Sequence, residues 1–154
     1  MNHSSHAPHA TYEDADLILR LYDLRREEKL RKARDWFLRE FSASSVKDFM
    51  EKYPPGGEQN AWYRMVVSYW EMAASFLVQG IIHEELFFQS SGEMLGVWEK
   101  VKPLMPELRA WAKNPLVLHN LEEAATKYIA WMNKHAPGSY EVMQEWMRKP
   151  AAKS

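Results

Sequence analysis

Cysteine is absent from this chain of 154 residues. Its absence excludes disulfides, thiolate nucleophiles, and zinc or iron–sulfur sites held by cysteine. Neither sign of charge is in excess, since 20 basic side chains balance 21 acidic ones and the formal net charge is −1. Such a balance provides no overall field that would attract nucleic acid, an anionic membrane or an acidic substrate.

Long apolar runs are missing as well. The longest stretch without a charged residue runs from Met72 to Ile82, which is too short to cross a bilayer and is typical of a buried core helix. The first ten residues are polar and rich in histidine, and they lack the apolar segment of a secretory signal. We therefore expect a cytoplasmic protein without a membrane span.

No segment alternates between apolar and polar residues for long enough to indicate a strand. Hydrophobic residues make up 46 % of the chain and charged residues 27 %, which is typical of a globular domain. We predict an all-α fold, a helical bundle of five to seven helices in a single domain of residues 11–149. A flexible histidine-rich tail (1–10) is expected before it, and a short tail (150–154) after it.

Caps, prolines and glycines predict where the helices begin and end. Thr11, with acidic residues just after it, predicts the start of a long helix that continues to about Phe41 without glycine or proline. Asn114 and Pro115 predict the cap and the first turn of another helix, which ends near His135. Shorter helices are predicted at 45–53, 93–102, 106–113 and 140–148.

The segment 61–89 predicts one long helix, capped by Asn60 and apolar nearly all round. A helix of this kind forms the centre of a bundle. It contains Gly80, and glycine inside a helix costs roughly 1 kcal/mol relative to alanine. We therefore expect a neighbouring backbone or ring to pack closely against Gly80.

A row of polar residues on this helix is the best candidate for a site. The residues, named the polar strip from here on, are Arg64, Ser68, Glu71, Ser75 and Gln79. They recur at steps of three and four and so share one narrow face of the helix. The polar strip is either a thin solvent-facing band or a buried seam that lines a pocket. If it is buried, Glu71 needs a basic partner, and we predict Arg109.

Motifs for metal or catalytic chemistry are incomplete. After His83 and Glu84 the second histidine of a zinc protease helix is missing, because Phe87 occupies its position. No Glu-x-x-His pair suits a di-iron bundle. His3 can chelate copper or nickel together with the N-terminal amine, but this arrangement arises often by chance, and His119 is expected on a surface helix. We predict no catalytic residue, no metal and no cofactor.

A resemblance covers roughly residues 60–112. It rests on the run Tyr69-Trp70-Glu71, on the segment from Gly80 to Phe88, and on Trp98-Glu99-Lys100 followed by Pro103 and Arg109. These patterns resemble a family of bacterial proteins described only as a domain of unknown function. The resemblance implies an all-helical bacterial protein without an assigned activity, and it supplies no catalytic residues.

Two functions remain open. Nine methionines and seven tryptophans give adaptable apolar surface, which favours a non-enzymatic interaction or regulatory module that binds a protein partner or a second copy. The alternative is a bundle that binds a small ligand or acts as an enzyme, with its pocket along the polar strip. The basic segment Arg20–Arg39 contains acids that pair with its bases, so no specific nucleic-acid binding is expected. A concave pocket at Glu71 would favour the alternative, and a flat apolar patch the interaction module.

Overall fold

In the computed structural model, which describes residues 9–149, the protein is built from nine α-helices and one short 3-10 helix. They are α1 (Tyr12–Arg25), α2 (Glu28–Arg39), α3 (Val46–Lys52), α4 (Glu58–Val78), α5 (Glu84–Ser90), α6 (Gly92–Val101), η1 (Lys102–Leu104), α7 (Met105–Ala112), α8 (His119–His135) and α9 (Ser139–Arg148). No strand occurs among these residues, and the predicted helical bundle is confirmed. Residues 1–8 of the predicted first tail and the whole of the predicted tail 150–154 lie outside the described residues. No described helix combines the length and apolarity needed to span a bilayer.

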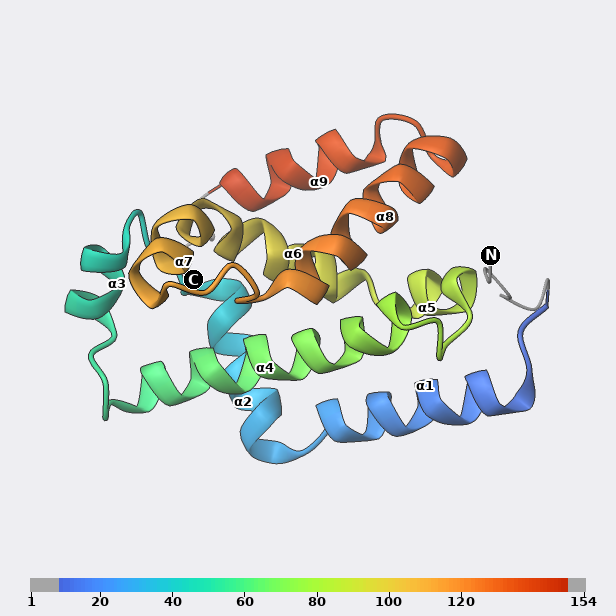
Figure 1. Cartoon of the computed structure of the whole chain (residues 1–154), viewed down its shortest axis with the longest axis horizontal. Coiled ribbons are helices and arrows are strands. Elements are labelled where there is room, and N and C mark those ends of the chain that lie inside the picture. The colour runs from blue at the N-terminus through green and yellow to red at the C-terminus, as the bar shows by residue number, and fades with distance from the viewer. Residues whose placement is uncertain (1–8, 150–154) are drawn as a thin grey trace.

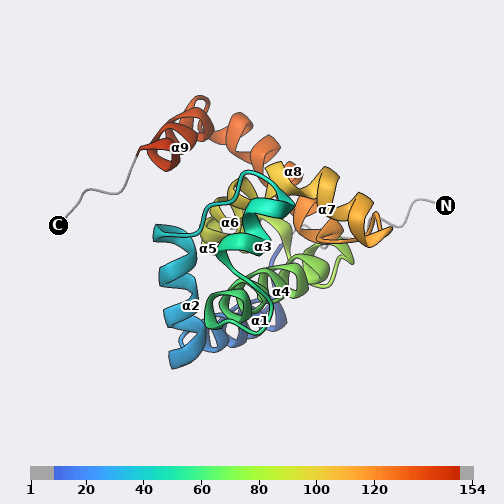
Figure 2. The same cartoon turned by 90° about the vertical axis from the view of Figure 1, so that its left-hand side faces the viewer.

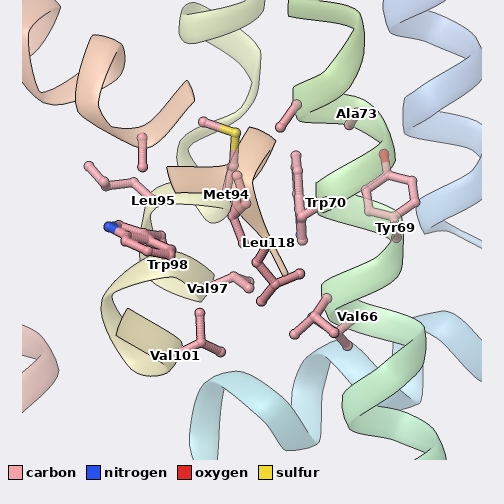
Figure 3. Close-up of a cluster of buried hydrophobic side chains, with 14 of the residues drawn as sticks. Val66, Tyr69, Trp70, Ala73, Met94, Leu95, Val97, Trp98, Val101 and Leu118 are labelled. Carbon is pink, nitrogen blue, oxygen red and sulfur yellow. The ribbon is translucent and has the colours of Figure 1, made fainter. Parts of the chain in front are cut away.

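Helix α4 forms the centre of the bundle. It packs against both α2 and α8 and contributes the fully buried Trp70. Figure 3 shows how Trp70 and Val66 of α4 point toward Met94 and Val97 of α6, with Leu118 between the helices. Helix α1 runs beside α4 along one edge of the molecule, and α8 and α9 lie at the opposite edge (Figure 1).

The predicted continuous helix 61–89 is wrong, because the helix ends at Val78 and Gly80 turns the chain. Gly80 has a φ of 73°, in the left-handed region that glycine adopts at little cost. Its N–H donates to the Leu77 carbonyl (3.0 Å), and the Ile81 N–H donates to the Phe76 carbonyl (2.9 Å). This pair of bonds is the Schellman motif that closes a helix. Gly80 is therefore required by the backbone of a helix end, and the expected close packing inside a helix does not apply.

The predicted long helix 11–41 is also divided. The structure confirms its start, because the Thr11 hydroxyl accepts the Asp14 N–H (3.3 Å) and the Asp14 carboxylate accepts the Thr11 N–H (2.7 Å). The helix nevertheless ends at Arg25. Glu27 leaves the helical conformation, and its carboxylate accepts the N–H groups of Lys29 and Leu30. A glutamate thus caps α2 from within a run that contains no glycine or proline.

Two further helix starts differ from the prediction. Helix α4 begins after Gly57, and Asn60 lies inside it with its amide donating to the Tyr53 carbonyl (2.9 Å). Helix α8 begins at His119, because Asn114 forms a local turn in which its side chain accepts the Leu116 N–H (2.9 Å). The two divided helices, and not these shifted starts, explain why the described residues form more helices than the five to seven predicted.

Candidate functional site

The polar strip follows the outer side of α4. Arg64, Ser68 and Gln79 are exposed, and Glu71 and Ser75 are half-buried. The two serine hydroxyls donate to carbonyls of their own helix, Ser68 to Met65 and Ser75 to Met72. Most of the strip therefore faces solvent with its hydrogen bonds made locally.

Glu71 is the exception, because its carboxylate binds the start of another helix. One oxygen accepts the backbone N–H of Asn120 (3.1 Å) and its side-chain amide (3.0 Å), and the other accepts the Leu121 N–H (2.8 Å). The first N–H groups of a helix lack internal partners and carry the positive end of the helix dipole. A carboxylate accepts hydrogen bonds from these N–H groups, and its negative charge interacts favourably with the helix dipole. Helix α8 has no side-chain cap from its own preceding residue, Leu118, so Glu71 supplies one.

The predicted pair of Glu71 with Arg109 is wrong. The Arg109 guanidinium donates to the Val117 carbonyl (3.0 Å) and to the Glu122 carboxylate (3.2 Å). Val117 belongs to the loop that enters α8, and Glu122 to its first turn. Glu71 and Arg109 therefore hold the same helix start, Glu71 through its N–H groups and Arg109 through the loop before it, without contacting each other in the described structure.

A hollow lies over the first half of the polar strip. It encloses about 640 Å³ and is open to solvent over much of its surface. Its lining comprises Ala61, Arg64, Met65, Val67, Ser68, Glu71 and Leu118. The Arg64 side chain donates to Asn60 (3.2 Å) and is exposed. Because the oxygens of Glu71 already bind α8, Arg64 is the charged group in this hollow that can meet a ligand.

A second depression was not predicted from the sequence. Helix α9 stands away from α2, with α6 between them (Figure 2), and side chains of all three helices line a groove of about 450 Å³. We name it the α9 groove. It is lined by Leu38 and Arg39 of α2, by Gly92, Gly96 and Lys100 of α6, and by Met143, Trp146, Met147 and Lys149 at α9.

Two glycines one turn apart lie on the α6 side of the α9 groove. A Cβ atom added to Gly96 would lie 3.8 Å from the Leu38 side chain, and one added to Gly92 would lie 3.6 Å from the Tyr128 hydroxyl. Both distances are ordinary van der Waals contacts, and neither residue has a positive φ. Packing and backbone geometry thus leave room for alanine at both positions. The glycines keep this side of the groove open.

The charged residues that line the α9 groove, all within the described range, are basic: Arg39, Lys100 and Lys149. Arg39 pairs with Asp35 on the exposed face of α2 (2.9 Å), and Lys149 lies over the Trp146 ring. The Lys100 ammonium donates to the Phe37 and Phe41 carbonyls (2.9 and 3.0 Å), at the end of α2. Burial lowers the pKa of Lys100, because the charged form loses solvation.

A polar network holds α9 against α6. The Tyr140 hydroxyl donates to the Glu99 carboxylate, which also accepts from the Lys102 ammonium (2.7 Å). Gln144 donates to the Tyr140 oxygen (3.0 Å). Burial and the adjacent Glu99 carboxylate raise the pKa of Tyr140, so the phenol keeps its proton. No side chain of α9 is fully buried, and this network therefore anchors a helix that the core holds only in part.

The family model described as Domain of unknown function (DUF4760) matches residues 10–128 of the chain. The chain belongs to this family. The match confirms the resemblance drawn from residues 60–112 and extends it in both directions. Neither a curated protein nor a solved structure matches the chain.

The DUF4760 match covers α1 to α7 and ends within α8. It includes Glu71 with its partners on α8, and the α2 and α6 sides of the α9 groove. Helix α9 lies outside the match. Within residues 9–149, no group of three or more His, Asp or Glu side chains is arranged to hold a metal ion.

Sequence reasoning missed the α9 groove, since its lining comes from three segments far apart in the chain. Trp146, from the last of these segments, is 70 % exposed. One local signal could have pointed to the groove. Gly92 and Gly96 recur at helical spacing with Lys100 one turn further, and such a row of small residues lets another helix approach closely.

Proposed function

We propose that this protein is a non-enzymatic interaction module whose α9 groove binds an amphipathic helix with acidic flanks from a protein partner. The observation that carries the proposal is the combination of an apolar lining with charges of one sign only. Apolar side chains provide the affinity in a helix-in-groove complex, and complementary charges select the partner and its orientation. The groove lies between two helices and over the glycines of a third, which suits a rod-shaped occupant.

Trp146 is the expected anchor of the complex. Exposed tryptophans are over-represented among the residues that dominate binding energies, and the neighbouring Met143 and Met147 adapt to varied apolar surfaces. Trp111 offers a matched control, because it is 67 % exposed and does not line the α9 groove. The comparison of these two tryptophans separates binding in the groove from nonspecific binding to exposed indole rings.

Two synthetic helical peptides test the proposal by fluorescence anisotropy. Both carry leucine at every third or fourth position, one with glutamate and the other with lysine at the flanking positions. The acidic peptide should bind and the basic one should not. Trp146→Ala should weaken binding by roughly tenfold or more, and Trp111→Ala should have little effect. Equal binding of both peptides, or equal effects of both substitutions, would contradict the proposal.

The hollow over the polar strip is the site of the alternative function, the binding of a small ligand. Its support is the position of the exposed Arg64 beside Ser68 and Glu71 in a hollow of about 640 Å³. An anionic ligand would suit this arginine. Titration with acetate and with inorganic phosphate should shift the amide resonances of Ser68 and Leu118, and Arg64→Ala should abolish the shifts. Absence of shifts in the intact protein would remove this alternative. The cytoplasmic and bacterial setting expected from the sequence stays a prediction.

A further inference from the structure

A smaller depression lies between α6 and α9, and we name it the basic pocket. It encloses about 270 Å³. It is lined by Glu99 and Lys100 of α6, by Lys102 of η1, and by Gln144, Met147 and Arg148 of α9. The basic pocket shares only Lys100 and Met147 with the α9 groove, so it is a separate depression beside the same helix.

The one carboxylate among the described lining residues of the basic pocket is already engaged within the protein. The Glu99 side chain is 9 % exposed, and the Lys102 ammonium binds it at 2.7 Å. Its oxygens also accept from the Tyr140 hydroxyl and from the Gln144 amide. Lys102 therefore compensates the charge of Glu99, and the remaining cations of the pocket have no carboxylate there to bind.

Those remaining cations are Lys100 and Arg148. The Lys100 ammonium donates to two backbone carbonyls at the end of α2, which carry no formal charge, and an ammonium has three N–H donors. Arg148 is exposed and forms no ion pair within residues 9–149. The nearest acid before it in the chain, Glu145, is exposed and does not line the pocket. One N–H of Lys100 and the guanidinium of Arg148 are thus available to an anion.

This pair of donors suits a phosphate group. Lysine binds phosphate as a point charge, and the planar guanidinium of arginine donates two parallel hydrogen bonds to phosphate oxygens. A phosphate monoester carries a charge of about −1.5 to −2 at pH 7, which matches two uncompensated cations. Burial lowers the pKa of Lys100, and a nearby anion would offset the lost solvation of its charged form. A pocket of about 270 Å³ admits only a small ligand.

We propose that the basic pocket binds a small phosphate, either the inorganic ion or a phosphate ester of low molecular mass. The proposal goes beyond the proposed function, because it concerns another depression and another class of ligand. A phosphate bound between Lys100 of α6 and Arg148 of α9 would also link these two helices. Binding should therefore protect the backbone amides of α9, a helix without a buried side chain, from hydrogen exchange.

Titration with inorganic phosphate at constant ionic strength, followed by amide resonances, tests the proposal. The resonances of Lys102, Gln144 and Arg148 should shift and reach saturation, whereas acetate should leave them unchanged. Arg148→Ala should weaken phosphate binding by roughly tenfold, because charge-assisted hydrogen bonds are lost. Arg148→Lys should retain part of the affinity. The same titration with glycerol 2-phosphate distinguishes the two sources, since tighter binding of the ester would identify an organic phosphate.

Matched controls separate the basic pocket from the α9 groove. Arg39→Ala removes an exposed cation that lines the groove but not the pocket, and should leave phosphate binding unchanged. Trp146→Ala should weaken binding of the acidic peptide and leave phosphate binding intact. Arg148→Ala should have the opposite pattern. Circular dichroism confirms that each variant is folded. The phosphate and peptide measurements are independent, so either proposal can fail without the other.

Three results would overturn the phosphate proposal. Shifts that grow without saturation, or that acetate reproduces, would indicate general screening of surface charge. Saturable shifts confined to Ser68 and Leu118 would locate the phosphate in the hollow over the polar strip. Undiminished phosphate binding by Arg148→Ala would show that the basic pocket is not the site.

Discussion

Glu71 of α4 caps helix α8 through the backbone N–H of Leu121, at 2.8 Å and across 50 positions of the chain. Together with its two bonds to Asn120, this contact couples the central helix to a helix start that lacks a cap of its own. The relationship changes the expected role of Glu71, from an ion-pair partner to a capping residue contributed by a distant helix.

Removal of this cap should destabilise the protein moderately. Loss of a capping side chain costs about 1–2 kcal/mol, so we expect that decrease in the free energy of unfolding for Glu71→Ala. Glu71→Gln retains one acceptor oxygen and should cost less. Urea melts measure both. Gln79→Ala, at the exposed end of the same polar strip, is the control and should change stability by under about 0.5 kcal/mol. Equal effects at the two positions would contradict the capping role.

Gly80 and Gly96 should respond to alanine in opposite directions. Gly80 has a φ of 73°, and alanine in this conformation costs about 1–2 kcal/mol. Gly96 lies within α6 with room for a methyl group, so Gly96→Ala should stabilise the protein by about 0.5–1 kcal/mol. Thermal or urea melts of the two variants give the signs. Stabilisation by Gly80→Ala would be incompatible with the observed helix end.

Tyr63 should contribute to unfolding at alkaline pH. Burial raises the pKa of Tyr63 to about 12 from an ordinary value of 10.0. The stability associated with its neutral form is complete below pH 10 and is lost as the pH rises from 10 toward 12. The loss amounts to about 2–3 kcal/mol once both states are ionised.

Tyr63→Phe should make stability less dependent on pH in this range, while keeping the ring between Phe41 and Phe49. Urea melts at successive alkaline pH values measure the change. Tyr12→Phe is the control, because Tyr12 is 96 % exposed. An identical pH dependence of Tyr63→Phe and the unaltered protein would show that Tyr63 is not the responsible phenol.

The ion pair of Arg34 with Glu93 should matter more than those on the surface. The guanidinium binds both carboxylate oxygens, at 2.9 and 2.7 Å, and the two side chains are only 23 % and 16 % exposed. This contact raises the pKa of Arg34, chiefly through the hydrogen bonds to Glu93. Glu93→Ala strands a largely buried charge and should cost about 3 kcal/mol.

The exposed pair of Arg39 with Asp35 provides the comparison for this prediction. Asp35→Ala should cost no more than about 0.5 kcal/mol, because solvent screens both charges. Arg34→Lys retains the charge but cannot bind both oxygens in a plane, and should recover only part of the stability. A double-mutant cycle in urea isolates the coupling. A coupling equal to that of the surface pair would refute the prediction.

Local signals were enough to predict the helical class and several helix boundaries. The short helix predicted at 45–53 is present as α3, and Ser45 caps it, since its hydroxyl accepts the Asp48 N–H (3.0 Å). The two missed breaks have physical reasons. Gly80 in an apolar run suits either a helix interior or a helix end, and its backbone conformation depends on how the next residues pack. Glu27 is a good helix former that here caps the next helix with its own carboxylate.

The site could be predicted only in part. Helical spacing predicted that the residues of the polar strip share one helix face, and Arg64 to Ser75 do lie within α4, whereas Gln79 is the residue that ends this helix. The partner of Glu71 could not be predicted, because backbone N–H groups at a helix start are present in every sequence. The α9 groove could not be predicted from the sequence either, for a related reason. Leu38, Gly96 and Trp146 resemble ordinary core residues until the fold brings their helices together.

Lys100 places a protonation equilibrium inside the α9 groove. Its charged form holds the last carbonyls of α2, and burial lowers its pKa. In the proposed complex, an acidic side chain docked nearby would favour the protonated form, so docking would be coupled to proton uptake. As the pH rises toward this lowered pKa, the hydrogen bonds of the Lys100 ammonium to the carbonyls at the end of α2 and its attraction for an acidic partner would weaken together. The C-terminal end of α2 and the affinity for the proposed partner helix thus depend on the protonation of the same side chain, Lys100.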